Sequence, residues 1–206
     1  MAINPNIQAD VIDIRKDTPK KSDIFFVDTN VWFWEIYAQT YEYRGFSNYQ
    51  IRNYPNYLRQ AGLHGATLTY SGLTLAELAH LIEKKEYEKY IKSNGDLPIK
   101  EYRHNYPLER AIVVNAVQFV WRRVKNRAKL IDLAVNDATT DAAIKRFSTQ
   151  AVDGYDLLLL ETISKAGQFQ VITDDIDYSV VPDIQVFTSN NRLIQEAATQ
   201  NKLVAR

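Results

Sequence analysis

Four acidic residues of this chain have the types and positions needed to hold a metal ion. Asp28 directly follows the apolar run 24–27, Asp175 follows a second apolar run, and Glu77 and Asp156 stand where helices are expected to begin. In α/β proteins, ligands bind beyond the carboxyl ends of parallel strands. Four carboxylates gathered there would repel one another unless a cation lay among them. Oxygen ligands without cysteine favour Mg²⁺ or Mn²⁺ over zinc, and such an ion suits phosphoryl chemistry.

The composition is that of an ordinary globular domain. The chain has 206 residues, of which 46% are hydrophobic and 24% charged, so it can bury a sizeable core. It has no cysteine, which excludes disulfides and fits a cytoplasmic location. We expect no membrane span, because no apolar run approaches the roughly 20 residues required, and the N-terminus lacks the features of a secretory signal. The net charge of zero neither supports nor excludes a nucleic-acid partner.

The elements that must position the acids alternate between strand and helix. Short apolar runs bounded by polar residues predict strands at 24–28, 66–70, 128–133, 169–173 and 184–188. Periodic segments predict helices from 31, at 75–92, 107–128, 139–148 and 157–166, and after 190. This alternation predicts an α/β fold with a central parallel sheet of about five strands flanked by helices.

The domain organisation follows from the same pattern. Residues 1–22 are polar and mixed in charge, and we interpret them as an N-terminal arm. Residues 23–206 form a single domain. It carries a Tyr/Arg-rich insertion at about 37–63 and an added helical segment at about 98–129.

Each acid also has a purely structural interpretation. Asp28 and Asp156 could cap helices or favour their dipoles, and Asp175 lies in a turn where acids are common. Glu77 could be the partner of Thr74 in a capping box. Taken singly these signals are weak, whereas their joint order is much stronger.

That order resembles PIN-domain ribonucleases, among them the toxins of bacterial toxin–antitoxin pairs. The similar segments are IFFVDTN, LTLAEL and DGYDLLLLETISKAGQFQVITDDIDY, within a likeness running from about 24 to 190. The resemblance implies a central parallel sheet and an acidic pocket for Mg²⁺ or Mn²⁺. Many small members are shorter, and the extra length here lies in the stretch 37–63 and the helix near 107–129.

The resemblance also implies the site residues. The four acidic positions of the family fall on Asp28, Glu77, Asp156 and Asp175, with Asp177 as a further ligand. Asp153 is the alternative to Asp156, and Asp174 the alternative to Asp175. We expect supporting hydrogen bonds from the following three residues: Thr29, Asn30 and Thr173. One or two metal ions would then activate water to hydrolyse an RNA phosphodiester bond.

Partners are less constrained by the sequence. The substrate expected from the resemblance is RNA, in single-stranded or loop regions, and an antitoxin protein and a second copy of this chain are candidate partners. The basic stretch with Arg122, Arg123, Lys125 and Arg127 could contact phosphates, although a solvated helical face is the simpler interpretation. The tyrosines and arginines of 37–63 could stack bases, pack the insertion onto the domain, or form a protein interface.

Two other function classes compete with a nuclease. One is a non-catalytic PIN-like module that binds RNA or a protein, for which four retained acids would have no purpose. The other is a phosphatase or phosphotransferase with Asp28 as covalent nucleophile. Enzymes of that kind resemble the haloacid dehalogenases and start with Asp-x-Asp, whereas this chain has Asn30 at the third position.

Overall fold

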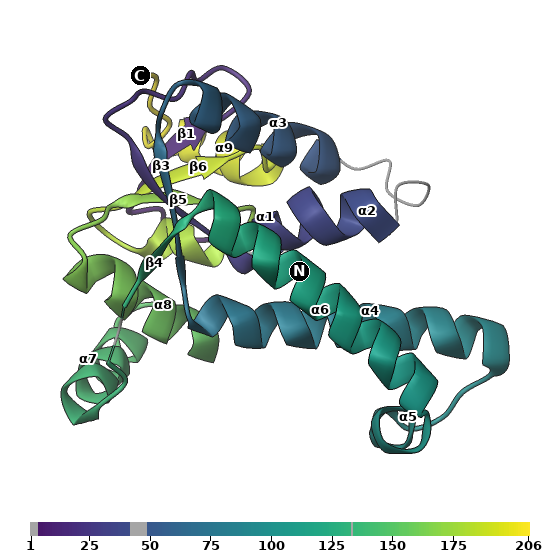
Figure 1. Cartoon of the computed structure of the whole chain (residues 1–206). Helices are drawn as coiled ribbons and strands as arrows, with labels where there is room; N and C mark the ends of the chain where they lie inside the picture. Colours follow the sequence, from purple (N-terminus) through teal and green to yellow (C-terminus); the bar gives the residue numbers. More distant parts are fainter. Residues whose placement is uncertain (1–3, 42–48, 133) are drawn as a thin grey trace.

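A computed structural model describes residues 4–41, 49–132 and 134–206 (Figure 1). Residues 42–48 of the predicted insertion and residue 133 of the third predicted strand lie outside the described part. The strands are β1 (Asp10–Asp13), β2 (Ile24–Val27), β3 (Thr67–Ser71), β4 (Lys129–Ile131), β5 (Gln170–Ile172) and β6 (Gln185–Thr188). The helices are α1 (Thr29–Trp32), the π-helix η1 (Phe33–Ala38), α2 (Gln39–Tyr41), α3 (Tyr49–Leu63), α4 (Leu73–Asn94), α5 (Ile99–Asn105), α6 (Pro107–Arg127), α7 (Asp137–Phe147), α8 (Gly154–Lys165), the 3₁₀ helix η2 (Asp177–Val180) and α9 (Asn191–Thr199).

The strands form one parallel sheet in the order β1-β6-β5-β2-β3-β4. The predicted α/β class, with a parallel sheet flanked by helices, is therefore confirmed. The chain builds outward from β2 through β3 to β4, and then returns to place β5 on the other side of β2. This reversal of direction lies between β2 and β5, where an open α/β sheet has its crevice for ligands.

Apolar side chains on both faces of the sheet explain why the strands read as continuous hydrophobic runs. Phe25 and Val27 of β2 pack into a core with α1, α3, α4 and α6, whereas Phe26 points to the other face and packs with α8 and α9. Alternate side chains of a strand point to opposite faces, so a buried central strand needs apolar residues at each position. The result is a three-layer arrangement of helices, sheet and helices.

The N-terminal segment departs from our expectation. We predicted an arm at 1–22, but Asp10–Asp13 form β1, the edge strand that pairs with β6. Val11 and Ile12 of this strand are fully buried. Val11 and Ile12 are the only two apolar residues of DVID, flanked by acids, so the sequence carried no strand signal there. Long-range backbone pairing with β6 and with residues 202–204 stabilises the strand.

The added helical segment forms an extension beside the sheet. Helices α4 and α6 pack against each other, and α5 lies at their far end (Figure 1). Two tyrosine rings contact a third there in edge-to-face and tilted arrangements, with the ring centroids of Tyr87 and Tyr90 lying 5.5 and 5.3 Å from that of Tyr102. Within the described ranges, no helix is both long and apolar enough to cross a membrane.

Candidate active site

The four predicted acids lie at the carboxyl edge of the sheet. Asp28 follows β2 and Asp175 follows β5, so these two flank the crevice between the neighbouring strands. Glu77 lies in the first turns of α4, directly after β3, and Asp156 lies in the first turn of α8. Asp28 interacts electrostatically with Glu77 and Asp175, and Asp156 with Asp28 and Asp175. The tertiary structure therefore brings together residues that are up to 147 positions apart.

Asp28 is buried and supports no helix cap. Its side chain is 4% exposed, and although it precedes α1 it makes no capping hydrogen bond. The hydroxyl of Thr173 donates to its Oδ2 at 2.8 Å. Burial raises the pKa of Asp28 to about 7; the Thr173 bond opposes this rise, and repulsion from Glu77 and Asp175 adds to it.

Glu77 serves the site and forms no capping box. Helix α4 begins at Leu73 after Gly72, without a side-chain cap, and the Glu77 carboxylate instead accepts a hydrogen bond from the hydroxyl of Thr29. Burial raises the pKa of Glu77, and repulsion from Asp153 and Asp175 acts in the same direction. The predicted support from Thr29 and Thr173 is thus present. The Asn30 side chain makes no hydrogen bond among the interactions described, and Asn30 lines the groove discussed below.

Asp156 and Asp153 have different structural roles. Asp153 caps α8, because its Oδ1 accepts hydrogen bonds from the backbone N–H groups of Tyr155 and Asp156 at 2.9 and 3.1 Å. The Asp156 carboxylate is buried and accepts a hydrogen bond from the Tyr178 hydroxyl at 2.8 Å. Burial raises the pKa of Asp156 to about 8, with repulsion from Asp28 adding to the effect. The two side chains thus have different hydrogen-bond partners, but both interact electrostatically with Asp175, and Asp156 as the metal ligand stays a prediction.

The same distinction separates Asp175 from Asp174. The backbone N–H of Asp175 donates to the Thr173 hydroxyl oxygen at 2.9 Å, and its Oδ1 accepts from the N–H of Asp177 at 2.9 Å. Asp174 instead accepts hydrogen bonds from side chains of α3. Burial raises the pKa values of Asp175 and Asp177, to which neighbouring acids contribute. Asp175 therefore belongs to the acid group, and Asp177 lies at its margin.

The chemistry of the acid group suits a divalent cation. The carboxylates are desolvated, and the charged neighbours that raise their pKa values are other acids. A cation among them would offset both the loss of hydration and the mutual repulsion of the carboxylates. Hard oxygen donors match Mg²⁺ or Mn²⁺. Among the described residues, however, no group of three or more His, Cys, Asp or Glu already has the arrangement of a metal site. The donors fit the ion by type, and side-chain adjustment is needed to complete a coordination shell.

A groove of about 350 Å³ opens next to Asp175. It is lined by Asn30, Trp34, Asp174, Asp175, Ile176, Asn190 and Arg192. Of the aromatic run 32–34, Trp32 and Phe33 are buried in the core, and only Trp34 reaches the groove, with its ring centroid 5.4 Å from that of Tyr54. Sequence reasoning missed Arg192 and Asn190. The polar pair Ser189-Asn190 directly after a strand was the available signal, because β6 ends at the same edge as β5.

The predicted basic residues lie elsewhere. Arg122, Arg123, Lys125 and Arg127 occupy the last turns of α6, which ends just before β4 begins, at the amino edge of the sheet. Arg127 forms an ion pair with Glu35, and the Arg123 guanidinium lies 5.0 Å from the ring centroid of Phe119. Contact between these four residues and RNA stays a prediction. An RNA strand that touched both them and the acid group would have to extend from one edge of the sheet to the other.

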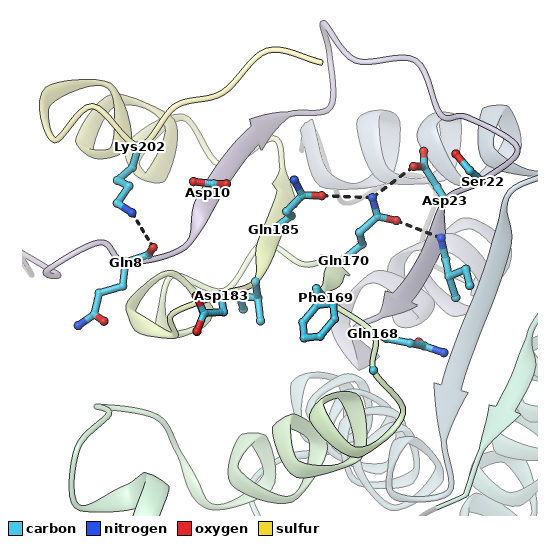
Figure 2. A pocket seen from close by; sticks show the side chains of 13 residues that line it. Gln8, Asp10, Ser22, Asp23, Gln168, Phe169, Gln170, Asp183, Gln185 and Lys202 are labelled. Carbon is cyan, nitrogen blue, oxygen red and sulfur yellow. Dashed lines mark hydrogen bonds between the residues drawn. The ribbon is translucent and has the colours of Figure 1, made fainter.

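A cavity of about 680 Å³ also lies at the amino edge. Figure 2 shows Gln170 on its floor, where the side-chain amide donates to Asp23 and Gln185, each at 3.2 Å. The start of each of the strands β1, β2, β5 and β6 contributes to the lining. None of the predicted acids lines this cavity.

Comparisons with known proteins place few constraints on the chain. No protein-family model matches it, and none of the curated proteins matches it. Among solved structures, it is similar to the crystal structure of VapBC2 from Rickettsia felis bound to a DNA fragment from their promoter. The identity is 14% and the TM-score 0.47, with 79% of this chain and 96% of that chain covered. A similarity of this size bears on neither activity nor partners, and the function is argued below from the site.

Proposed function

We propose that this chain is a metal-dependent endoribonuclease of the PIN-domain type. The observation that carries the proposal is the meeting of Asp28, Glu77, Asp156 and Asp175 at the switch point of a parallel sheet. Burial and mutual repulsion raise the pKa values of these acids, and a bound cation would relieve both effects. The sequence resemblance to PIN-domain ribonucleases points to the same residues.

The proposed role of each acid follows from its position and its contacts. Asp28 and Asp175, which flank the crevice, are the proposed direct ligands of Mg²⁺ or Mn²⁺, with Asp156 beside them and Asp177 at the margin. A divalent ion, when bound, would lower the pKa of a water molecule and stabilise the negative charge that develops on the phosphate. Thr173 orients Asp28 through its hydroxyl, and Thr29 orients Glu77, which is placed to hold the attacking water and accept its proton.

The groove next to Asp175 suits an unpaired strand. The half-buried indole of Trp34 offers a surface for base stacking, and Arg192 brings positive charge to a rim that otherwise carries acids. A double helix would not present its bases to such a surface. We therefore propose single-stranded or looped RNA as the substrate. An antitoxin and a second copy of the chain are proposed as partners on the resemblance alone.

One observation favours a second candidate function. Because no metal group is preformed among the described residues, a non-catalytic module that binds RNA or a protein is the alternative. The two functions differ in whether metal is bound and in whether RNA is cut.

The test is cleavage of a pool of 5′-labelled single-stranded RNAs in Mg²⁺, Mn²⁺ or EDTA. Asp28→Asn and Asp175→Asn should abolish cleavage and weaken Mn²⁺ binding. Asp183→Asn is the matched control, because this acid is exposed at the amino edge and Asn tolerates its positive φ of 61°. RNA binding without metal binding and without cleavage would instead establish the non-catalytic module.

A further inference from the structure

The carboxylate of Asp174 is held by three neutral side chains of α3. The Tyr49 hydroxyl donates to it, lying 3.0 and 2.9 Å from its two oxygens. The Gln50 amide donates to Oδ2 at 3.1 Å, and the Tyr54 hydroxyl donates to Oδ1 at 2.7 Å. All three donors therefore reach one acid from a single side.

The backbone on either side of this carboxylate is fixed as well. The Tyr54 hydroxyl lies 3.0 Å from the carbonyl oxygen of Thr173, and the side-chain amide of Asn190 donates to the carbonyl oxygen of Asp174 at 2.9 Å. Helix α3 is itself anchored, because it packs on η1 and β3. A rigid helix thus holds the two residues that immediately precede Asp175.

This arrangement has an electrostatic consequence. Asp174 and Asp175 repel each other, and Asp175 also interacts electrostatically with Asp28, Glu77 and Asp156. Without the α3 donors, the Asp174 carboxylate would be free to turn toward the acid group and displace Asp175 from it. With the donors in place, Asp174 stays on the outer side, and the backbone directs the next side chain toward Asp28.

We propose that Tyr49, Gln50 and Tyr54 are positioning residues, which brace the Asp174 carboxylate so that Asp175 points into the acid group. The brace assigns a role to the part of the Tyr/Arg-rich insertion in α3, for which the sequence left base stacking, packing and a protein interface open. The inference rests on the proposed function only in taking Asp175 as a ligand of the ion.

The first variants to test are Tyr49→Phe and the double variant Tyr49→Phe/Gln50→Met. Both remove donors to Asp174 while keeping side-chain volume. Tyr54→Phe is less suitable, because its hydroxyl also contacts Thr188 and accepts from the buried N–H of Ser189. Tyr57→Phe is the matched control, since the Tyr57 hydroxyl, also on α3, donates to Asp17 away from the acid group.

Three readouts apply to each purified variant. Loss of groups that orient metal ligands commonly weakens metal binding about 10–100-fold, so we expect the double variant to bind Mn²⁺ about 10-fold more weakly. The kcat for RNA cleavage should fall by a similar factor, with KM within about 2-fold, because the groove itself is retained. Amide hydrogen exchange at Asp175 and Asp177 should accelerate, because their hydrogen bonds depend on the same turn. Tyr57→Phe should change none of the three.

The outcomes separate the brace from the nuclease. If the double variant matches Tyr57→Phe in Mn²⁺ binding and in exchange at Asp175, the brace is overturned. If the unmodified protein neither binds Mn²⁺ nor cuts RNA, the proposed function fails. Exchange at Asp175 then still decides whether α3 holds this turn: acceleration in the double variant supports the brace, and unchanged exchange refutes it.

Discussion

At the scale of single residues, Thr173 connects the two acids that flank the crevice. Its hydroxyl donates to Asp28 and accepts from the backbone N–H of Asp175, and its side chain is fully buried. A hydroxyl can donate and accept at the same time, whereas a carboxylate only accepts and an amide N–H only donates. The orientation of Asp28 and of the turn at Asp175 therefore depends on one oxygen atom.

Replacing this hydroxyl should damage both stability and the metal site. Thr173→Val keeps the shape but leaves the Asp175 N–H without its acceptor, at a cost of about 1–3 kcal/mol of unfolding free energy. Mn²⁺ affinity should fall about 10–100-fold. Chemical denaturation and calorimetric titration measure the two effects. Thr173→Ser should restore most of both, and a Val variant that binds Mn²⁺ normally would refute the assignment.

The raised pKa values predict how stability depends on pH. The carboxyls of Asp28 and Asp156 have ordinary pKa values of 3.8, whereas folding raises them to about 7 and about 8. Between these limits the folded chain binds more protons than the unfolded chain, so stability falls as pH rises. Their stabilising contribution is full below pH 3.8 and is lost as pH rises through about 7 and 8.

The melting temperature, measured in EDTA from pH 6 to pH 9, should decrease as the pH rises. Mn²⁺ should reduce the decrease, because a cation favours the ionised carboxylates that high pH produces. Asp156→Asn should flatten the EDTA profile, since an amide does not titrate. A wild-type profile that is already flat would contradict the raised pKa values.

At the scale of elements, an ion pair network joins α5 and α6 to α4. Glu83 of α4 is buried, and it accepts hydrogen bonds from Arg103 of α5 at 2.8 Å and from Arg110 of α6 at 3.0 Å. The Arg103 hydrogen bond lowers the pKa of Glu83, against an opposing effect of burial. The two arginines are partly exposed, so solvent screens this attraction.

Glu83→Gln should therefore destabilise the helical extension by about 1–2 kcal/mol, less than a fully buried pair would. Denaturant unfolding measures the loss. Glu88→Gln is the control, because its pair with Lys85 at 3.3 Å is on the surface and should contribute less than about 0.5 kcal/mol. Equal effects of the two substitutions would show that Glu83 does not hold the extension.

At the scale of the whole molecule, the last residues close the edge of the sheet. Val204 and Lys202 exchange backbone hydrogen bonds with Val11 of β1. The Arg206 guanidinium forms ion pairs with Asp17 and Asp23, each at 2.8 Å, and lies 4.5 Å from the ring centroid of Phe187. The N-terminal and C-terminal segments thus stabilise each other far from the acid group.

Arg206→Ala should destabilise the fold by about 3–5 kcal/mol, because it leaves two buried carboxylates without their cation. Thermal unfolding measures this, and Arg206→Lys should recover only part, since lysine lacks the planar fork that reaches both acids. Cleavage by the folded fraction should be unchanged. A loss of less than about 1 kcal/mol would show that the network is solvated.

The sequence by itself determined most of the architecture. Each predicted strand from 24–28 to 184–188 has a counterpart in the sheet, because short apolar runs favour strands, although β4 is buried only at Ile131. It also determined which acids to examine, since Asp28, Glu77, Asp156 and Asp175 follow strands or open helices. Strand β1 was not predicted, because its four residues become a strand through long-range pairing with β6 and with residues 202–204.

Only the tertiary structure shows how neighbouring candidates differ in their contacts. Asp174 and Asp175 are adjacent, and only two residues separate Asp153 from Asp156, so local patterns cannot rank them. The contacts that distinguish them come from segments distant in the sequence. The hydroxyls of Tyr49 and Tyr54 donate to Asp174, whereas the hydroxyl of Tyr178 donates to Asp156. The same holds for Glu77, whose partner is Thr29 rather than its own helix. A side chain's role depends on which atoms surround it, and packing between distant segments sets that surrounding.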